Sequence, residues 1–432
     1  MKKAASFALG CKVNQYESEA IAELFAEKGY EIVGIDEEAD VYVINTCTVT
    51  NFGDKKSRQL IRKVKRQNEN AIVAVVGCYA QTAPKELMEI AGVNLVIGTK
   101  DRAQIVEMVE QYDRANGVEN HVSDIMKERV FEPLSIQKLA NRTRAYLKIQ
   151  DGCSQYCSYC IIPYARGPIR SREPQEVVAE VKRLAENGFK EVVLTGIHVA
   201  SYGKDRRDTS LLDILKQVHE VEGIERIRFS SIEPNVVTEE FAQTMAALPK
   251  VCDHFHLSLQ SGCDKTLKEM NRKYDTEKYR QAVATLRKYL PKVALTTDII
   301  VGFPGETEED FRESYAFAEE IGFAKIHVFP YSPKRGTPAA ARKDQLLNAV
   351  KSERSHTLIQ LSDRMAADFL ADAVGTDAEV LYERVVGDGI YEGHTTNYMK
   401  VHGRSEADLT NRIAKTHITR AEGEMLFGDV EV

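Results

Sequence analysis

Three cysteines stand close together in the segment Asp151-Gly152-Cys153-Ser154-Gln155-Tyr156-Cys157-Ser158-Tyr159-Cys160. Thiolates at this spacing can bind three irons of one 4Fe-4S cube, and the next cysteine, Cys252, lies far along the chain. One iron is therefore left open for another ligand. A structural zinc knuckle is the alternative, but zinc needs four closed ligands and no fourth candidate is near. The segment predicts an iron-sulfur site with an open position.

A repeating strand-helix pattern surrounds this segment. Six expected strands run through residues 143–335, at Ala145–Ile149, Lys190–Ile197, Arg226–Ile232, His254–Gln260, Ala294–Gly302 and Lys325–Ser332. Helical patterns follow the first five. Because six units are too few for a closed eight-stranded barrel, we expect an open (β/α)6 partial barrel. Its ligands should bind at the C-terminal ends of the strands, where the cysteine segment lies.

A second group of cysteines, Cys11, Cys47 and Cys78, lies in the first 110 residues. Strand and helix patterns alternate there and predict an open α/β domain with a largely parallel sheet. Each cysteine directly follows an expected strand, so the three thiols should meet at one sheet edge. Gly10 and Gly77 suit close approach of the backbone to a bulky ligand. Three small buried residues are the alternative, because cysteine favours interiors. We predict a second 4Fe-4S cluster, again with one open iron.

The C-terminal part changes character. Residues 336–371 are expected to form a helical connector, and from about residue 372 strand patterns alternate with glycines. This predicts a small all-β barrel of a class that often binds oligonucleotides. The expected domains are residues 1–140, 141–370 and 371–432.

Composition limits the partners. The formal net charge of −7 argues against bulk attraction to nucleic acid, so such a partner must be contacted by local patches. No apolar run approaches the ~20 residues of a membrane span. The apolar run Ala4–Gly10 is short and a helix pattern follows at once, so we expect no signal peptide and a cytoplasmic protein. Eight cysteines in a reducing compartment indicate metal binding or catalysis.

With both cysteine groups in place, the chain resembles the methylthiotransferase family of radical S-adenosylmethionine (SAM) enzymes over its whole length. The similar segments are Gly10–Glu17 (GCKVNQYE), Asn45–Thr50 (NTCTVT), Gly77–Gln81 (GCYAQ), Asp151–Cys160, Ile162–Gly167 (IPYARG), Leu259–Gly262 (LQSG) and Gly302–Thr307 (GFPGET). The C-terminal domain is similar to the TRAM domain of that family. Within the family, the chain is most similar to bacterial enzymes that act on N6-threonylcarbamoyladenosine at tRNA position 37.

The resemblance implies two SAM-dependent steps. The cluster on Cys153, Cys157 and Cys160 would serve radical generation, which activates the C2–H bond of the adenine. The cluster of the second group would supply a methylated sulfur. The implied partners are the tRNA anticodon loop and an external electron donor such as flavodoxin or ferredoxin. Isopentenyladenosine in tRNA and an aspartate of a ribosomal protein are alternative substrates, and a non-catalytic iron-sulfur protein that binds RNA or transfers electrons is a further alternative.

Other candidate residues follow from their positions. Those near barrel strand ends, or on a strand, are candidates for SAM binding, although each is also an ordinary turn or capping residue: Gly196, Ser231, Glu233, Gln260 and Asp298. The expected helix Lys55–Arg66 is basic and without acids, which indicates phosphate contact or merely a solvated face. The candidate RNA contacts are Lys55, Arg58, Arg62, Lys63 and Arg66, with Arg166 and Arg170 as a second patch.

Overall fold

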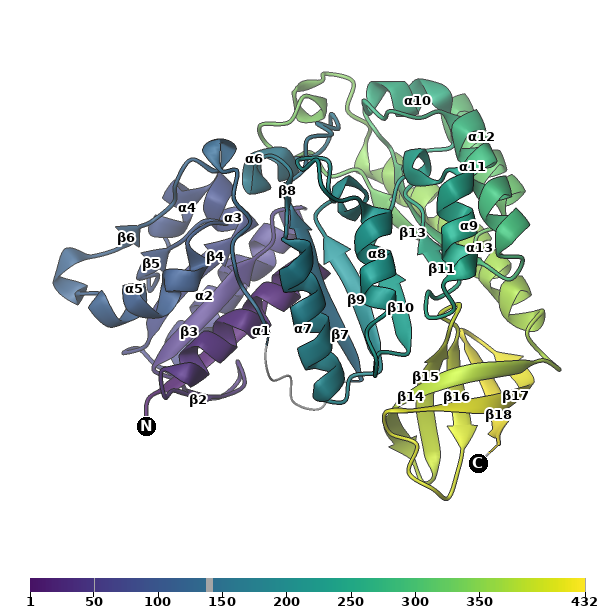
Figure 1. Ribbon diagram of the computed structural model, residues 1–432. Coiled ribbons are helices and arrows are strands. Elements are labelled where there is room, and N and C mark those ends of the chain that lie inside the picture. The colour runs from purple at the N-terminus through teal and green to yellow at the C-terminus, as the bar shows by residue number, and fades with distance from the viewer. Residues whose placement is uncertain (50, 137–142, 432) are drawn as a thin grey trace.

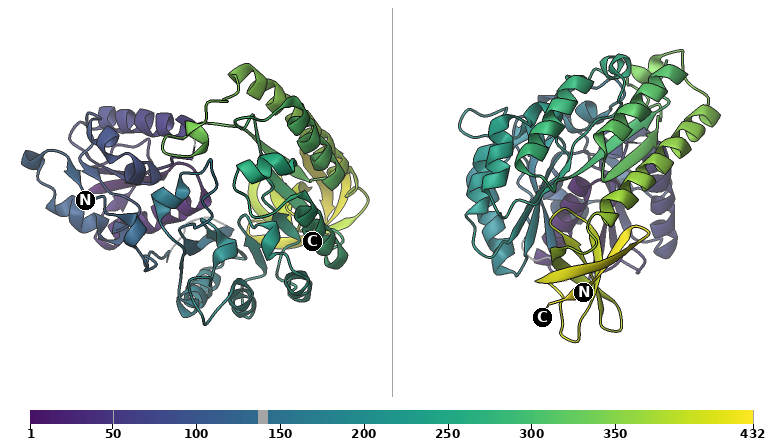
Figure 2. Two further views of the ribbon diagram at one scale, coloured as in Figure 1. Left: turned by 90° about the horizontal axis from the view of Figure 1, so that it is seen from above. Right: turned by 90° about the vertical axis from the view of Figure 1, so that its right-hand side faces the viewer.

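The computed structural model describes residues 1–49, 51–136 and 143–431. It shows a parallel α/β layer, an open barrel beside it and a closed β-barrel beneath (Figure 1). Seen from above, the N-terminal sheet lies next to the barrel (Figure 2). The predicted boundary between residues 140 and 141 lies outside the described residues, as does Thr50 of the second cysteine motif.

The N-terminal layer is a six-stranded sheet with the order β2-β1-β3-β4-β5-β6, and all its pairings are parallel. Its strands are β1 (Lys3–Ala8), β2 (Glu31–Ile32), β3 (Val41–Thr46), β4 (Ile72–Gly77), β5 (Leu95–Val96) and β6 (Glu119–Asn120). Its helices are α1 (Lys12–Glu27), α2 (Asn51–Gln67), α3 (Cys78–Thr82), α4 (Pro84–Met88) and α5 (Ile105–Gln111).

Alternating side chains of β3 give this sheet two buried faces. Val41 and Val43 pack with residues of α1 and α5, whereas Tyr42 and Ile44 pack with residues of α2 and α4. Helices therefore cover both faces, which is why the strands are continuous apolar runs. Tyr16 and Ala20 of α1 join the barrel core instead, so α1 packs against both the sheet and the barrel.

The middle part confirms the predicted open barrel. Its strands are β7 (Arg144–Asp151), β8 (Arg170–Ser171), β9 (Glu191–Gly196), β10 (Arg226–Phe229), β11 (His254–His256), β12 (Ala294–Val301) and β13 (Lys325–Pro330). They form the sheets β10-β9-β7-β8 and β11-β12-β13, whose backbones are joined in the described residues by isolated bridges such as Ile232–Leu257. Its helices are α6 (Ile162–Arg166), α7 (Pro174–Glu186), α8 (Leu211–His219), α9 (Glu239–Ala247), α10 (Asp264–Glu269), α11 (Thr276–Tyr289), α12 (Glu308–Ile321) and α13 (Asn348–Ala371).

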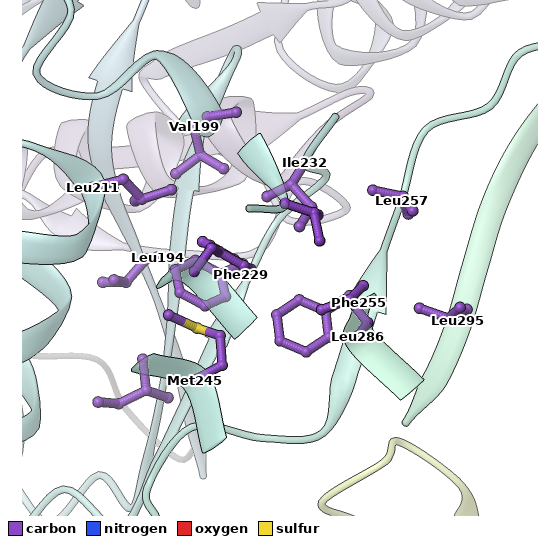
Figure 3. Close-up of a cluster of buried hydrophobic side chains, with 14 of the residues drawn as sticks. Leu194, Val199, Leu211, Phe229, Ile232, Met245, Phe255, Leu257, Leu286 and Leu295 are labelled. Atoms are coloured by element: carbon purple, nitrogen blue, oxygen red, sulfur yellow. The ribbon is translucent and has the colours of Figure 1, made fainter. Parts of the chain in front are cut away.

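The largest core lies between the barrel strands and their helices (Figure 3). Phe229 and Phe255 stack at its centre with ring centroids 6.3 Å apart, which ties β10 to β11 across the point where the two sheets meet. Leu194, Met245 and Leu286 surround them. The strand faces that point away from this core are left to line the barrel interior.

The C-terminal part is a closed barrel of β14 (Asp377–Gly387), β15 (Ile390–Thr395), β16 (Lys400–Arg404), β18 (Met425–Val430) and β17 (Arg412–Glu422). It abuts the N-terminal end of the large barrel. Arg228 of β10 donates hydrogen bonds to the carbonyls of Thr395 and Thr396, and Arg226 donates to that of His394.

The structure adds elements that the sequence pattern did not predict. The two-residue strands β2, β6 and β8 are too short to show periodicity, and β18 was not anticipated. The expected connector is helical chiefly over α13. Among the described residues, no helix is both long and apolar enough to cross a bilayer.

Candidate active site

The C-terminal edge of the N-terminal sheet carries Cys11, Cys47 and Cys78. Cys11 caps α1, Cys47 directly follows β3, and Cys78 begins α3 after β4; β1, β3 and β4 are neighbours in the sheet. A Cβ atom added at Gly10, where φ is +98°, would lie 2.7 Å from Cys47 Sγ. Glycine there lets the Cys11 turn come close to Cys47.

These thiols act on one another electrostatically. Burial, with Cys78 as the next contribution, raises the pKa of Cys47 to about 12. Burial also raises the pKa of Cys11, which Arg166 opposes and Cys78 reinforces. Neutral thiols are therefore favoured without metal, and iron binding must displace their protons.

Arg166 connects this edge to the barrel. Its Nε atom lies 3.1 Å from Cys78 Sγ, and its Nη2 atom donates a 2.6 Å hydrogen bond to Asn14 Oδ1. The Asn14 amide in turn donates to the carbonyls of Leu9 and Thr46, beside the two other cysteines. Through these contacts the Arg166 guanidinium holds the three cysteine-bearing turns together.

The loop of Cys153, Cys157 and Cys160 follows β7 at the C-terminal end of the barrel. The Cys153 amide donates to the Gly167 carbonyl at 3.0 Å. A Cβ atom at Gly152, where φ is +73°, would lie 1.9 Å from the Pro168 carbonyl oxygen. The loop is thus pinned to the segment that carries Arg166. Burial raises the pKa of Cys153 to about 11 and that of Cys160 to about 12.

Arg272 is a residue that the sequence pattern did not single out. Its Nη1 atom lies 3.2 Å from Cys157 Sγ, and its Nη2 atom donates a 2.8 Å hydrogen bond to Glu233 Oε1. Each cysteine group therefore has one arginine beside one of its sulfurs. Arg272 lies more than a hundred residues from the cysteine loop, so nothing in local sequence could have indicated it.

The donor set fits iron-sulfur clusters better than single ions. Within the described residues, no three His, Cys, Asp or Glu side chains are close enough to hold one metal ion. With Zn–S bonds of about 2.3 Å, thiolates on one zinc would lie within roughly 4 Å of each other. In a 4Fe-4S cube each thiolate binds its own iron, so the ligands stand farther apart. Three thiols in each group, each able to bind one iron, are the donor set that a 4Fe-4S cube with one open iron requires.

Two of the expected SAM residues lie near the first cysteine group. Glu233 is buried and reaches Cys157 through Arg272, and its Oε2 atom lies 3.3 Å from His198 Nε2. At Gly196, a Cβ atom would lie 2.8 Å from Gln150 Oε1. The glycine therefore makes room for Gln150 rather than directly for a ligand.

The remaining three candidates, Ser231, Gln260 and Asp298, lie elsewhere in the barrel. The backbone N–H of Gln260, a residue with φ of +72°, donates a 2.8 Å hydrogen bond to the backbone carbonyl of Asp298. Asp298 and Ser231 line a cavity of about 480 Å³ inside the barrel, which neither Gln260 nor any of the six cysteines lines. The structure therefore does not gather the five candidates into one group.

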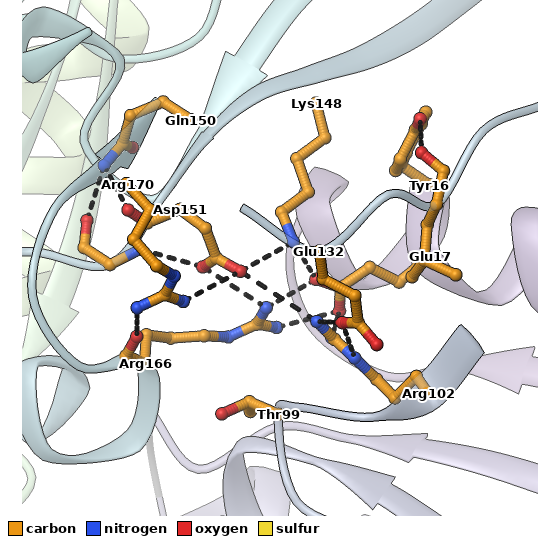
Figure 4. A network of polar contacts seen from close by, with 12 residues as sticks. Tyr16, Glu17, Thr99, Arg102, Glu132, Lys148, Gln150, Asp151, Arg166 and Arg170 are labelled. Carbon is orange, nitrogen blue, oxygen red and sulfur yellow. Dashed lines mark hydrogen bonds and ion pairs between the residues drawn. The ribbon is translucent and has the colours of Figure 1, made fainter. Parts of the chain in front are cut away.

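A buried network of charges joins the two parts between the cysteine groups (Figure 4). Glu17 of α1 binds Arg102, Lys148 and Arg166 at 2.5, 2.7 and 2.5 Å. Asp151, directly before the cysteine loop, binds Lys148 at 2.6 Å. Further members are Arg170, Glu132 and Gln150. Every side chain in it is buried or nearly so, so the network fixes the first cysteine loop relative to α1.

The network corrects one expectation. Arg166 and Arg170 are buried, with 0% and 2% of their surfaces exposed, so they do not form an RNA-binding patch on this surface. Their charge is used inside the protein. Although burial alone would raise the pKa of Glu17, Arg102, Arg166 and Lys148 hold it well below its ordinary value.

The basic helix also differs from the expectation. Helix α2 begins at Asn51 and includes Asp54, which pairs with Lys334. Lys63 pairs with Asp36, and Arg58 donates to the Tyr79 hydroxyl. Three of the candidates remain exposed without a charged partner among the described residues, at the helical spacing of one face: Lys55, Arg62 and Arg66.

Comparisons with known proteins agree with this arrangement. Residues 147–318 match the Radical SAM superfamily, and residues 3–98 match the uncharacterized protein family UPF0004. The threonylcarbamoyladenosine tRNA methylthiotransferase of Bacillus subtilis (strain 168) is 46% identical over 98% of this chain and 94% of its own. The tRNA-2-methylthio-N(6)-dimethylallyladenosine synthase of Moorella thermoacetica is 36% identical over 98% and 96%. A radical SAM methyltransferase from Kitasatospora setae, solved with cobalamin and a 4Fe-4S cluster, has a similar fold (TM-score 0.59, 17% identity, 79% of this chain and 74% of that one).

An open parallel barrel with three cysteines after its first strand defines a radical SAM enzyme. The chain belongs to the methylthiotransferase family of these enzymes, as the sequence motifs predicted. Its cofactors are SAM and two 4Fe-4S clusters. The C-terminal closed barrel is consistent with the TRAM-like domain that was expected.

Proposed function

We propose that this enzyme adds a methylthio group to C2 of N6-threonylcarbamoyladenosine at position 37 of tRNA. The observation that carries the proposal is the pair of cysteine groups, each beside an arginine and joined through Arg166. A relative that is 46% identical over nearly the whole chain is named a threonylcarbamoyladenosine tRNA methylthiotransferase, which supports the proposed substrate. Methylthiolation of isopentenyladenosine is the second candidate, because relatives named for that nucleoside are 36% identical over nearly the same length.

We assign different tasks to the two groups. Cys153, Cys157 and Cys160 would hold the cluster that supplies the electron for SAM cleavage. Cys11, Cys47 and Cys78 would hold the cluster from which sulfur is delivered. An external donor such as flavodoxin or ferredoxin would provide the electron. Cytoplasmic tRNA would be the substrate.

The chain's own residues prepare both sites. Arg166 and Arg272 place positive charge against one sulfur of each group, and each arginine holds that sulfur in position for iron. Glu233 and His198 fix Arg272 from the other side. Arg166 and Glu233 are buried, which keeps water away from the contacts that they make beside the two groups.

Mass spectrometry of tRNA nucleosides tests the proposed substrate. In cells that lack the gene, 2-methylthio-N6-threonylcarbamoyladenosine should disappear and its unmethylthiolated precursor should accumulate. The chain supplied from a plasmid should restore it. Loss of the methylthio-isopentenyl nucleoside instead, with the threonylcarbamoyl form intact, would assign the second candidate.

For the basic face of α2, we expect that reversing Lys55, Arg62 and Arg66 to Glu weakens tRNA binding. Removal of one phosphate contact should lower the slope of log affinity against log salt concentration by about one unit. Binding measured from roughly 50 to 200 mM salt gives this slope, because screening changes strongly over that interval.

A matched control reverses three exposed lysines on barrel helices, Lys182, Lys216 and Lys288, with the same change in net charge. The control should keep the wild-type slope. SAM cleavage without tRNA should also stay unchanged in the α2 variant. Equal slopes for the two variants would show that α2 is merely a solvated face.

A further inference from the structure

The cavity inside the barrel is walled by all three parts of the chain. Lys12 at the start of α1, Asp298 of β12, His327 of β13 and Tyr398 before β16 line its volume of about 480 Å³. Tyr398 stacks on His254 with ring centroids 4.9 Å apart and lines the end of the cavity next to the C-terminal barrel. Lys12 is the residue directly after Cys11, so it connects this cavity to the sheet edge that carries the second cysteine group, although no cysteine lines the cavity itself.

Lys12 differs from the other lysines in this cavity. Lys325 pairs with Asp363 and Glu424, and Lys400 lies 4.0 Å from a carboxylate oxygen of Glu392. Lys12 is exposed, and within the described part of the chain no acidic side chain lies within ion-pair distance of it. Its Nζ atom lies over the ring of Tyr146, 5.8 Å from the centroid.

The charges around Lys12 leave it uncompensated. Arg144 and Arg228 are the cations that act on it most, and Glu191 is the carboxylate that acts on it. Glu191 already binds both arginines, with Arg228 Nε at 2.8 Å. Glu383 binds Arg144 as well, and Asp298 in the cavity lies 3.2 Å from His256 Nε2. The carboxylates on this side are therefore used by other residues, and an anionic ligand would give the Lys12 ammonium the partner that it lacks.

We propose that Lys12 binds the carboxylate of the N6-threonylcarbamoyl group and so selects an anionic N6 substituent, which rests on the proposed function above. C2 and C6 of adenine flank the same ring nitrogen. A base whose C2 faces the Cys11 edge therefore directs its N6 substituent into the adjoining space, where Lys12 stands. An isopentenyl group carries no anion and leaves the lysine unpaired. Lys12 is a specificity-determining residue, and Tyr398 limits how far the substituent extends.

The test uses anaerobically reconstituted holoenzyme and an anticodon stem-loop RNA that carries either N6-threonylcarbamoyladenosine or its neutral methyl ester. Affinity and kcat/KM are measured for wild type, Lys12→Gln and Lys12→Arg. Wild type should prefer the acid over the ester by about 10- to 100-fold, the effect of one charge-assisted hydrogen bond. Lys12→Gln should bind both RNAs equally weakly, and Lys12→Arg should restore most of the preference. Lys216→Gln, on the outer face of α8, is the matched control and should behave as wild type.

These measurements separate the proposed role of Lys12 from other roles that the residue could have. If Lys12→Gln keeps the full wild-type preference for the acid, with or without a loss of cluster iron, the proposal is overturned. An increase in the KM for SAM alone would assign Lys12 to the cofactor and also overturns it. Wild-type enzyme that methylthiolates an isopentenyl RNA but neither RNA of the test would contradict the proposed function instead.

Discussion

Replacing Cys153, Cys157 or Cys160 by Ala is expected to abolish reductive cleavage of SAM. Replacing Cys11, Cys47 or Cys78 should leave 5′-deoxyadenosine formation measurable but stop methylthio transfer. The reason is position: the first group lies on the loop after β7, and the second lies on the edge of a separate sheet. Substitutions in the first group should therefore remove both SAM cleavage and methylthio transfer, whereas those in the second group should remove transfer alone.

The measurement is deoxyadenosine released by reduced protein with SAM, alongside methylthiolated nucleoside in the tRNA. Circular dichroism must show that each variant is folded, because Arg166 links the Cys78 edge to the loop of the first group. Loss of deoxyadenosine in both sets of folded variants, each with its other cluster in place, would mean that the clusters act as one coupled redox unit.

Glu17→Gln is expected to lower the free energy of unfolding by about 3–5 kcal/mol, the cost of breaking a buried ion pair from one side. Glu17 is fully buried and faces Arg102, Lys148 and Arg166, so the variant leaves three buried cations short of one anion. Urea unfolding of the reconstituted protein measures the change. Iron bound near Cys78 should fall as well, because Arg166 would lose its partner.

The pH dependence gives this prediction a second measurement. The pKa of Glu17 is held below its ordinary value in the folded protein, so its stabilisation is present above about pH 4.3 and is lost as the pH falls. The acid side of the stability curve should be shallower for Glu17→Gln than for wild type. The control, Glu220→Gln, changes a side chain that is 83% exposed and should shift stability by about 0.5 kcal/mol or less. Equal losses in the two variants would contradict a structural role for the network.

The apolar periodicity was sufficient to predict the barrel strands and the N-terminal sheet, because both are built from runs such as Val41–Thr46 whose burial shows in their composition. The cysteine groups were predictable from spacing alone, since parallel strands end at one edge. The strand and helix ends were displaced by a few residues, as at α2, where the helix starts four residues before the expected Lys55.

The buried charges were not predictable. Arg166 and Arg170 follow the cysteine loop as basic residues would on a surface, and only the tertiary fold brings Glu17 and Asp151 to them. Arg272 likewise reaches Cys157 from the distant segment between α10 and α11. The sequence alone does not reveal whether a charged side chain faces solvent or pairs with a distant segment. For this reason Arg166 and Arg170 were expected to contact RNA, whereas the structure places them in a buried network of ion pairs.

Iron and acid-labile sulfide counted on the reconstituted protein test the central assignment most directly. Two clusters require about eight irons per wild-type chain and about four in a variant of either cysteine group. The remaining four should sustain SAM cleavage in the Cys11, Cys47 and Cys78 variants only. Wild-type protein with about four irons and full methylthiotransferase activity would contradict the assignment of a second cluster to the N-terminal sheet edge.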